Sequence, residues 1–173
     1  VTFSVSDKDY GKWNVLVRTD ANNNVRELDE DNNLIAIPLT VLQSQLPDLT
    51  IKELSTEEIL TSGQPMKVKT TIANIGKNAT RTDKWSDTYY LSASTVLNVN
   101  TATKIGSKIH VGKLDVDATY SNEVSFNIPA NMQGNFMLFA VSDASDAITE
   151  MDENNNVKSI PVYVNGTADT PAD

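Results

Sequence analysis

The stretch VSFNIPANMQGNFMLFAVSDASDAITEMDENNNVKSIPVYV (residues 124–164) repeats, without a gap, the stretch VTFSVSDKDYGKWNVLVRTDANNNVRELDEDNNLIAIPLTV (residues 1–41). The two stretches begin 123 residues apart, at positions 1 and 124. Apolar positions mostly change only to other apolar residues, and Gly11, Asp20, Glu27 and Pro38 recur unchanged. A period of this length indicates repeated whole domains, and about 120 residues suits a small β-sandwich.

This repeat predicts the domain organisation. We expect residues 1–41 to be the last three strands of a preceding repeat, 42–47 a linker, 48–164 a complete domain, and 165–173 a linker to a subsequent repeat or tail. The parent chain is then expected to continue beyond both ends. Three strands cannot cover their own apolar face. The missing strands would come from upstream sequence, or from another copy of the chain in a filament assembled by strand addition.

Short apolar runs with a period of two, separated by Asn, Asp, Gly and Pro, predict an all-β fold. For the complete repeat we predict strands over residues 49–54, 66–74, 87–93, 108–112, 123–128, 135–141 and 157–164. Seven strands in two sheets would form an immunoglobulin-like β-sandwich, here in tandem.

Alternation along the strands also predicts which side chains enter the core. In residues 66–72, Met66, Val68 and Ile72 share one face while the lysines take the other. Comparing the two repeats places Phe136, Leu138 and Ala140, with their counterparts Trp13, Val15 and Val17, on the core side. Met137, Phe139 and Val141 are expected on an outer surface that faces a neighbour.

Composition excludes several classes of protein. The chain has no cysteine, so it has no disulfide, no thiol nucleophile and no cysteine metal site. Its single histidine, His110, excludes sites built from several histidines and is expected to be an ordinary strand residue. A net charge of −9 disfavours nucleic acid and anionic membranes as partners. No apolar run approaches the length of a membrane span.

Carboxylate and amide oxygens crowd the turn before the last strand of each repeat. Calcium takes six to eight oxygen ligands, and such a turn is one way to supply them. The candidate ligands are Asp20, Glu27, Asp29 and Asn32 in the first repeat and Asp143, Glu150, Asp152 and Asn155 in the second. Two other interpretations stay open: Asp and Asn simply shape the turn, or a buried Glu caps backbone amides.

The aromatic residues Trp85, Tyr89 and Tyr90 admit two interpretations. They could form a sugar-binding platform, but strand alternation sends one of the two tyrosines inward, which favours core packing. The acids cluster in a repeated turn without a nucleophile, a base or a pocket signature, so we predict no enzymatic activity.

Several motifs together resemble the CARDB family, the cell-adhesion-related domain of bacteria and archaea. They are WSDTYYLSAS at residues 85–94, the Asn-Ile-Gly turn at 74–76, Gly134 opening a strand that ends in Asp143, and the tail EMDENNNV at 150–157. The tail recurs as ELDEDNNL at residues 27–34. The resemblance covers about 48–164 as one domain and 1–41 as the end of another.

The resemblance implies an immunoglobulin-like spacer or adhesion module of a large surface or secreted protein. We therefore expect an extracellular, non-catalytic module, with calcium stiffening the acidic turns where it binds. Its partners would be neighbouring repeats, other copies in a filament, or a cell-surface or polysaccharide ligand. The alternative is a module that binds carbohydrate or protein through loops at one end of the sandwich.

Overall fold

A computed structural model describes residues 2–5, 9–29, 31–42, 45–57 and 59–166. The chain forms two compact units, a hairpin unit at Val1–Ser44 and a sandwich unit at Gln45–Asp173. Val1, residues 43 and 44 of the first predicted linker, and residues 167–173 of the second lie outside the described residues.

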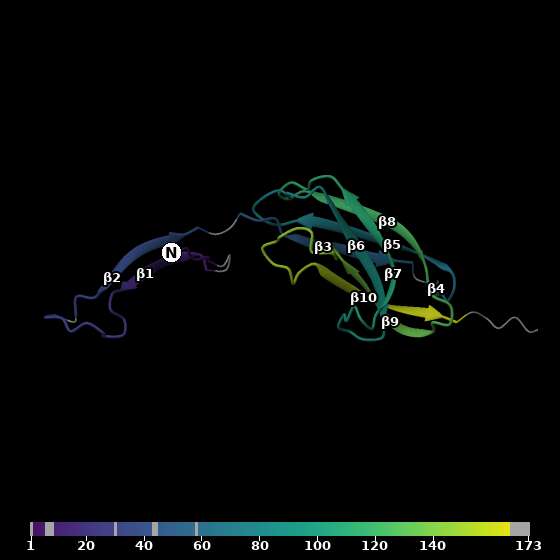
Figure 1. Ribbon diagram of the computed structural model, residues 1–173. Coiled ribbons are helices and arrows are strands. Elements are labelled where there is room, and N and C mark those ends of the chain that lie inside the picture. The colour runs from purple at the N-terminus through teal and green to yellow at the C-terminus, as the bar shows by residue number, and fades with distance from the viewer. Residues whose placement is uncertain (1, 6–8, 30, 43–44, 58, 167–173) are drawn as a thin grey trace, which may run out of the picture. The chain divides into compact units, whose positions relative to one another are not determined.

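The sandwich unit is an all-β, immunoglobulin-like sandwich of two sheets (Figure 1). One sheet has the strand order β4-β10-β9-β6-β7 and the other β3-β5-β8. Neighbouring strands are antiparallel except β4 and β10, which are parallel. The strands are β3 (Leu49–Thr56), β4 (Leu60–Thr61), β5 (Pro65–Asn74), β6 (Lys84–Ser92), β7 (Thr103–Val111), β8 (Thr119–Asn127), β9 (Gly134–Val141) and β10 (Val157–Asn165).

The core lies between the two sheets, where apolar side chains meet from both sides. Met66, Val68 and Ile72 on β5 are buried, as the alternation predicts, while Lys67 and Lys69 point to solvent. They pack in one cluster with residues of the other sheet such as Tyr89 and Leu138. Burying an aliphatic side chain of this size contributes roughly 1.5 to 3 kcal/mol. This packing therefore holds the two sheets together.

Several details of the sandwich differ from the sequence prediction, and three of them are informative. The two-residue strand β4 was not predicted, and β7 begins five residues earlier than residue 108. The early part of β7 contains Gly106, which faces the Phe126 ring on the opposite sheet at a distance that leaves no room for a Cβ. Phe139, expected on the outer surface, is buried. It lies in the central strand with Tyr90 and Ser159 as register partners on its two sides, and such neighbours cover a side chain on the same face.

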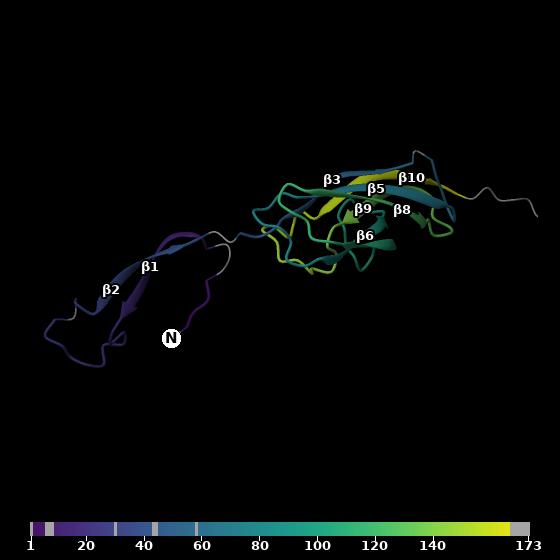
Figure 2. The same cartoon turned by 90° about the horizontal axis from the view of Figure 1, so that it is seen from above.

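The hairpin unit consists of β1 (Gly11–Arg18) and β2 (Leu34–Val41), an antiparallel pair (Figure 2). The third strand expected at the start of the chain does not form over its described part, residues 2–5. The counterpart of that segment in the sandwich unit is β8, which pairs with β5. Because residues 1–44 contain no counterpart of β5, the segment has no strand to pair with.

Candidate functional site

The conspicuous polar site of the sandwich unit joins two segments that are far apart in sequence. We call residues 143–156, between β9 and β10, the acidic turn. We call Gln45–Thr50, which leads into and begins β3, the lead-in segment. Four of the predicted ligand residues lie in the acidic turn, namely Asp143, Glu150, Asp152 and Asn155.

Asp143 shapes the first half of the acidic turn. Its backbone is left-handed, with a φ of 44°, as is that of Asp146, with a φ of 57°. Its carboxylate accepts hydrogen bonds from the amides of Ala147 at 3.1 Å and Ile148 at 2.7 Å. Burial raises the pKa of Asp143, these two amides lower it, and the charge of Asp146 raises it. Asp tolerates the left-handed conformation because its short side chain bonds locally.

The side chain of Glu150 contacts the start of β3, the first strand of the sandwich unit. Its buried carboxylate accepts hydrogen bonds from the amide of Leu49, which opens β3, and from the Asn156 side chain at 2.9 Å. Burial raises the pKa of Glu150 to about 8, although these two hydrogen bonds lower it. The neighbouring carboxylates of Glu153 and Asp143 raise it further. Glu150 therefore caps a backbone amide, which was one of the sequence interpretations.

Further contacts from the acidic turn hold the lead-in segment. The Asn155 side chain donates to the Asp48 carboxylate at 2.7 Å, and the backbone carbonyl of Asn155 accepts from the Thr50 hydroxyl at 3.4 Å. The Met151 amide donates to the carbonyl of Pro47 at 2.9 Å. The last turn of the domain thus fixes the first residues of the same domain.

Asn74, at the end of β5, holds the lead-in segment from the other side. Its side-chain oxygen accepts from the amides of Asp48 and Gly76, both at 3.0 Å, and its side-chain nitrogen donates to the carbonyls of Asn78 and Leu114 at 2.8 and 3.1 Å. All four bonding positions of this buried amide are occupied. Sequence patterns marked the Asn-Ile-Gly turn only as part of a resemblance and assigned Asn74 no role.

The other candidate ligands make local contacts. Asp152 is exposed and accepts from the Asn154 amide at 3.0 Å. In the hairpin unit, Asp20 accepts from the amides of Asn24 and Val25 at 2.7 and 2.9 Å, and Asp29 accepts from that of Asp31. Glu27 and Asn32 are exposed in that same unit.

The backbone amides bonded by Asp20, Asp29, Asp143, Glu150 and Asp152 fit turn formation and amide capping. Within the part of the chain that the structure describes, no three His, Cys, Asp or Glu residues gather as a metal site would require. Calcium coordination by the predicted residues stays a prediction.

Another buried acid lies on β6 and was not predicted from the sequence. Asp87 accepts from the Tyr120 hydroxyl at 2.8 Å and from the Asn122 side chain at 2.8 Å. The Tyr120 hydroxyl in turn accepts from the Trp85 indole at 2.9 Å. Burial raises the pKa of Asp87, while its hydrogen-bond donors and the charge of His110 lower it. The signal was available, since Asp87 lies on the same face of its strand as the buried Trp85 and Tyr89.

The side chains of Trp85 and Tyr89 belong to the core and not to an open platform. Trp85 and Tyr89 are buried, and only Tyr90 is partly exposed. His110, on β7, stacks on the Trp85 ring with centroids 4.0 Å apart, and its Nε2 lies 2.9 Å from the Gly112 carbonyl oxygen. Core packing is thus confirmed for Trp85 and Tyr89, and the platform interpretation is wrong for them.

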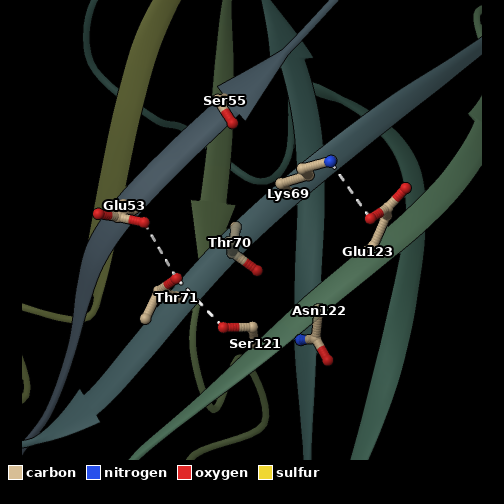
Figure 3. A pocket seen from close by; sticks show the side chains of 8 residues that line it. All are labelled: Glu53, Ser55, Lys69, Thr70, Thr71, Ser121, Asn122 and Glu123. Atoms are coloured by element: carbon tan, nitrogen blue, oxygen red, sulfur yellow. Dashed lines mark hydrogen bonds and ion pairs between the residues drawn. The ribbon is translucent and has the colours of Figure 1, made fainter.

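The outer face of the three-stranded sheet carries a shallow polar hollow of about 270 Å³ (Figure 3). Lys69 and Glu123 form an ion pair across it at 3.3 Å, and the Thr71 hydroxyl contacts Glu53 and Ser121. Its eight lining residues include no aromatic ring that could stack on a sugar. Several of the lining side chains thus bond one another, and the hollow carries no proposal of a ligand site here.

Comparison with known proteins agrees with this fold. The sequence profile of the CARDB family matches residues 46–160. A CARDB domain of Pyrococcus furiosus, solved in complex with di-metal ions, has a TM-score of 0.50 and 19% identity over 72% of this chain and 94% of its own. A domain of a proposed cell surface protein of Methanosarcina acetivorans has a TM-score of 0.48 and 17% identity over 73% of this chain and 99% of its own.

The remaining similarities add little about activity. A β-glucosidase of Listeria innocua has a TM-score of 0.45 and 16% identity, over 69% of this chain and 16% of the enzyme. No curated protein matches the sequence. Among the described residues, no helix is long and apolar enough to cross a membrane.

Proposed function

Because the chain belongs to the CARDB family, we propose that it is a non-catalytic, adhesion-related structural module of a cell-surface or secreted repeat protein. In this role the sandwich unit is a spacer that holds neighbouring parts of the protein apart. Neighbouring repeats and surface molecules are the partners that such a module would contact.

The anchoring of the lead-in segment is the observation that carries this proposal. The acidic turn bonds to Pro47, Asp48 and Leu49, and Asn74 bonds to Asp48 from the opposite side. Each of these contacts fixes the point at which the chain enters the domain. A spacer needs this property, because a loosely held first strand would let the preceding segment swing freely.

The spacer role can be tested by placing the chain between a cell-surface anchor and a small binding tag. The comparison replaces the chain by a Gly/Ser linker with the same number of residues, and the partner of the tag is immobilised behind a polymer layer. We expect more of the partner to be bound when the tag is carried by this chain than when it is carried by the linker. Equal reach with both would count against a spacer. Glycan hydrolysis that disappears in Asp152→Ala would instead identify an enzyme.

Calcium binding is a finer part of the proposal. Burial, and to a smaller extent the charges of neighbouring acids, raise the pKa values of Glu150 and Glu153, and a cation would relieve the repulsion between these acids. The related Pyrococcus domain was solved with di-metal ions. Thermal unfolding with and without millimolar calcium tests the idea. Saturation at a hundred times the Kd adds roughly 2.7 kcal/mol, and this gain should vanish in Glu150→Gln and Asp152→Asn. No gain in the unmodified chain would leave the turn as an amide cap alone.

Binding of carbohydrate or protein is a second candidate function. The observation that favours it is an open groove of about 450 Å³ along β9 and β10, where the Tyr163 ring is half exposed beside Pro161 and Met137. Exposed aromatic rings stack on sugars and anchor protein partners. Glycan-array and pull-down signals that are lost in Tyr163→Ala but kept in Tyr90→Ala would favour this function over a plain spacer.

A further inference from the structure

We infer that the hairpin β1–β2 closes a second sandwich, and that its apolar face takes a strand set like residues 45–123 of this chain, from a neighbouring repeat of the same polypeptide. The partner is defined by its chemistry: two apolar-faced sheet portions, preceded by a lead-in segment that offers backbone groups to the turn around Glu27. Failure of the spacer or adhesion tests would leave this expectation unchanged, because it concerns only how the hairpin is covered.

The hairpin has the backbone of the pair β9–β10. β1 and β9 occupy equivalent positions 123 residues apart, and Gly11 pairs with Val41 as Gly134 pairs with Val164. The backbone amide after β1 and the one after β9 donate to equivalent carbonyls. Thr19 donates to Asn33 at 3.0 Å, and Ser142 donates to Asn156 at 2.9 Å. Both hairpins therefore share one register and one closing hydrogen bond.

The turns between the strands also agree in detail. Asp20 has a φ of 40° and Asn23 a φ of 53°, close to the values of their counterparts Asp143 and Asp146. The Asp20 carboxylate accepts from the amides four and five residues later, as the Asp143 carboxylate does. The pair β1–β2 and the start of the turn between its strands thus already have the conformation they would need inside a complete sandwich.

The two hairpins differ in whether their apolar side chains are covered by other residues. Val25 is 59% exposed while its counterpart Ile148 is 3% exposed, and Val17 is 45% exposed while Ala140 is 2% exposed. Trp13 is half exposed, although its counterpart Phe136 packs against the core. Apolar residues at equivalent positions of the two repeats are therefore buried in one unit and open in the other. Exposed patches of this kind mark interaction surfaces.

The sandwich unit shows what covers such a face. There the sheet β3-β5-β8 supplies the opposite wall of the core, and the lead-in segment gives the Leu49 amide to Glu150 and the Pro47 carbonyl to the Met151 amide. By position, Glu27 corresponds to Glu150 and Leu28 to Met151. The partner should therefore present one backbone amide to the Glu27 carboxylate and one carbonyl to the Leu28 amide.

A second copy of this chain fits the face less well. Its own strand set is already closed by β9 and β10, with Leu49, Met66 and Leu138 fully buried between the sheets. Taking that set for another molecule's hairpin would mean displacing strands that are held in the same polypeptide, at a high effective concentration. A neighbouring repeat offers the set without this competition.

The test extends the chain at its start. Residue 1 aligns with residue 124, so a second copy of residues 45–123 joined directly ahead of Val1 preserves the repeat spacing. We expect the Trp13 indole to become shielded from acrylamide, toward the level of the buried Trp85, and a second cooperative unfolding transition to appear. Trp13→Phe, which places the residue found at 136, identifies the Trp13 signal in both chains.

A matched pair of variants tests the role assigned to Glu27. In the extended chain, Glu27→Gln should lower the midpoint of the added transition and leave that of the existing domain unchanged. Glu150→Gln should do the reverse: it should lower the midpoint of the existing domain and leave the added transition unchanged. Unchanged quenching of Trp13 in the extended chain, with the existing domain intact, would overturn the inference. So would a dimer of the unextended chain in sedimentation whose formation shields Trp13, because a second copy would then be the partner.

Discussion

Replacing Asn74 by Ala should destabilise the sandwich unit more than any exposed asparagine could. The buried side chain makes four hydrogen bonds, two accepted from the amides of Asp48 and Gly76 and two donated to the carbonyls of Asn78 and Leu114. Each contributes about 1 kcal/mol net, so the loss is roughly 4 kcal/mol. Domains of this size have about 5 to 15 kcal/mol of stability, so the variant should still fold.

The assay is equilibrium urea unfolding at 25 °C, followed by fluorescence of the buried Trp85. With a slope of about 2 kcal/mol per molar urea, Asn74→Ala should lower the midpoint by roughly 2 M. The control is Asn98→Ala, which removes one exposed contact to the Asn100 amide and should change stability by at most about 0.5 kcal/mol. Asn74→Asp keeps both acceptors but faces two carbonyl oxygens with a negative charge, so it should be at least as unstable at pH 7.

A loss below about 1 kcal/mol in Asn74→Ala, or one equal to that of the control, would refute this reasoning. Hydrogen exchange gives a second readout. The Asp48 amide should lose protection in the variant, since Asn74 is its acceptor, while amides within β9 should keep theirs.

Three other predictions concern buried groups of the sandwich unit. Because the pKa of Glu150 rises from 4.5 in the unfolded chain to about 8 when folded, its contribution to stability is full below pH 4.5 and is lost as pH rises toward 8. Urea midpoints should therefore fall between pH 5 and 8, with a flatter slope in Glu150→Gln. Gly106→Ala would place a Cβ 2.2 Å from the Phe126 ring and should cost about 1 to 3 kcal/mol in calorimetry, against almost nothing for the exposed neighbour Ser107→Ala. Tyr120→Phe removes the hydroxyl that bonds Asp87 and Trp85 and should cost about 2 kcal/mol, whereas the half-exposed Tyr163→Phe should be neutral in the same urea assay.

The sequence predicted β9 and β10 almost to the residue, because both strands alternate clearly and occur twice. It predicted the inward face of β5 for the same reason of alternation. It missed β4, since a strand of two residues has no period to detect. It placed Phe139 outside, because alternation alone does not show that a central strand is covered by its neighbours on both sides.

For the candidate site, the sequence identified the right turn but not the partners of its side chains. A buried Glu that caps amides was among the interpretations, yet the amide belongs to Leu49, 101 residues away. Such a pairing depends on how the sheets close and leaves no local pattern. Asn74 and Asp87 were overlooked as centres of buried hydrogen bonds, because polar residues within strands are usually taken as surface residues.

The parallel pairing of β4 with β10 determines how the domain would respond to tension. β4 follows β3, the first strand of the sandwich unit, and β10 is its last strand. Two hydrogen bonds reinforce the pair: the Ser62 amide donates to the Asn165 carbonyl, and the Asn165 side chain donates to the Leu60 carbonyl. Pulling the two ends of the domain apart drags parallel neighbours in opposite directions along their axes. The hydrogen bonds between β4 and β10 are then loaded at the same time, in shear, and do not break one after another. We expect single-molecule stretching between residues 45 and 166 to show one abrupt rupture, at a lower force in Asn165→Ala, whereas gradual extension would mean that the strands peel.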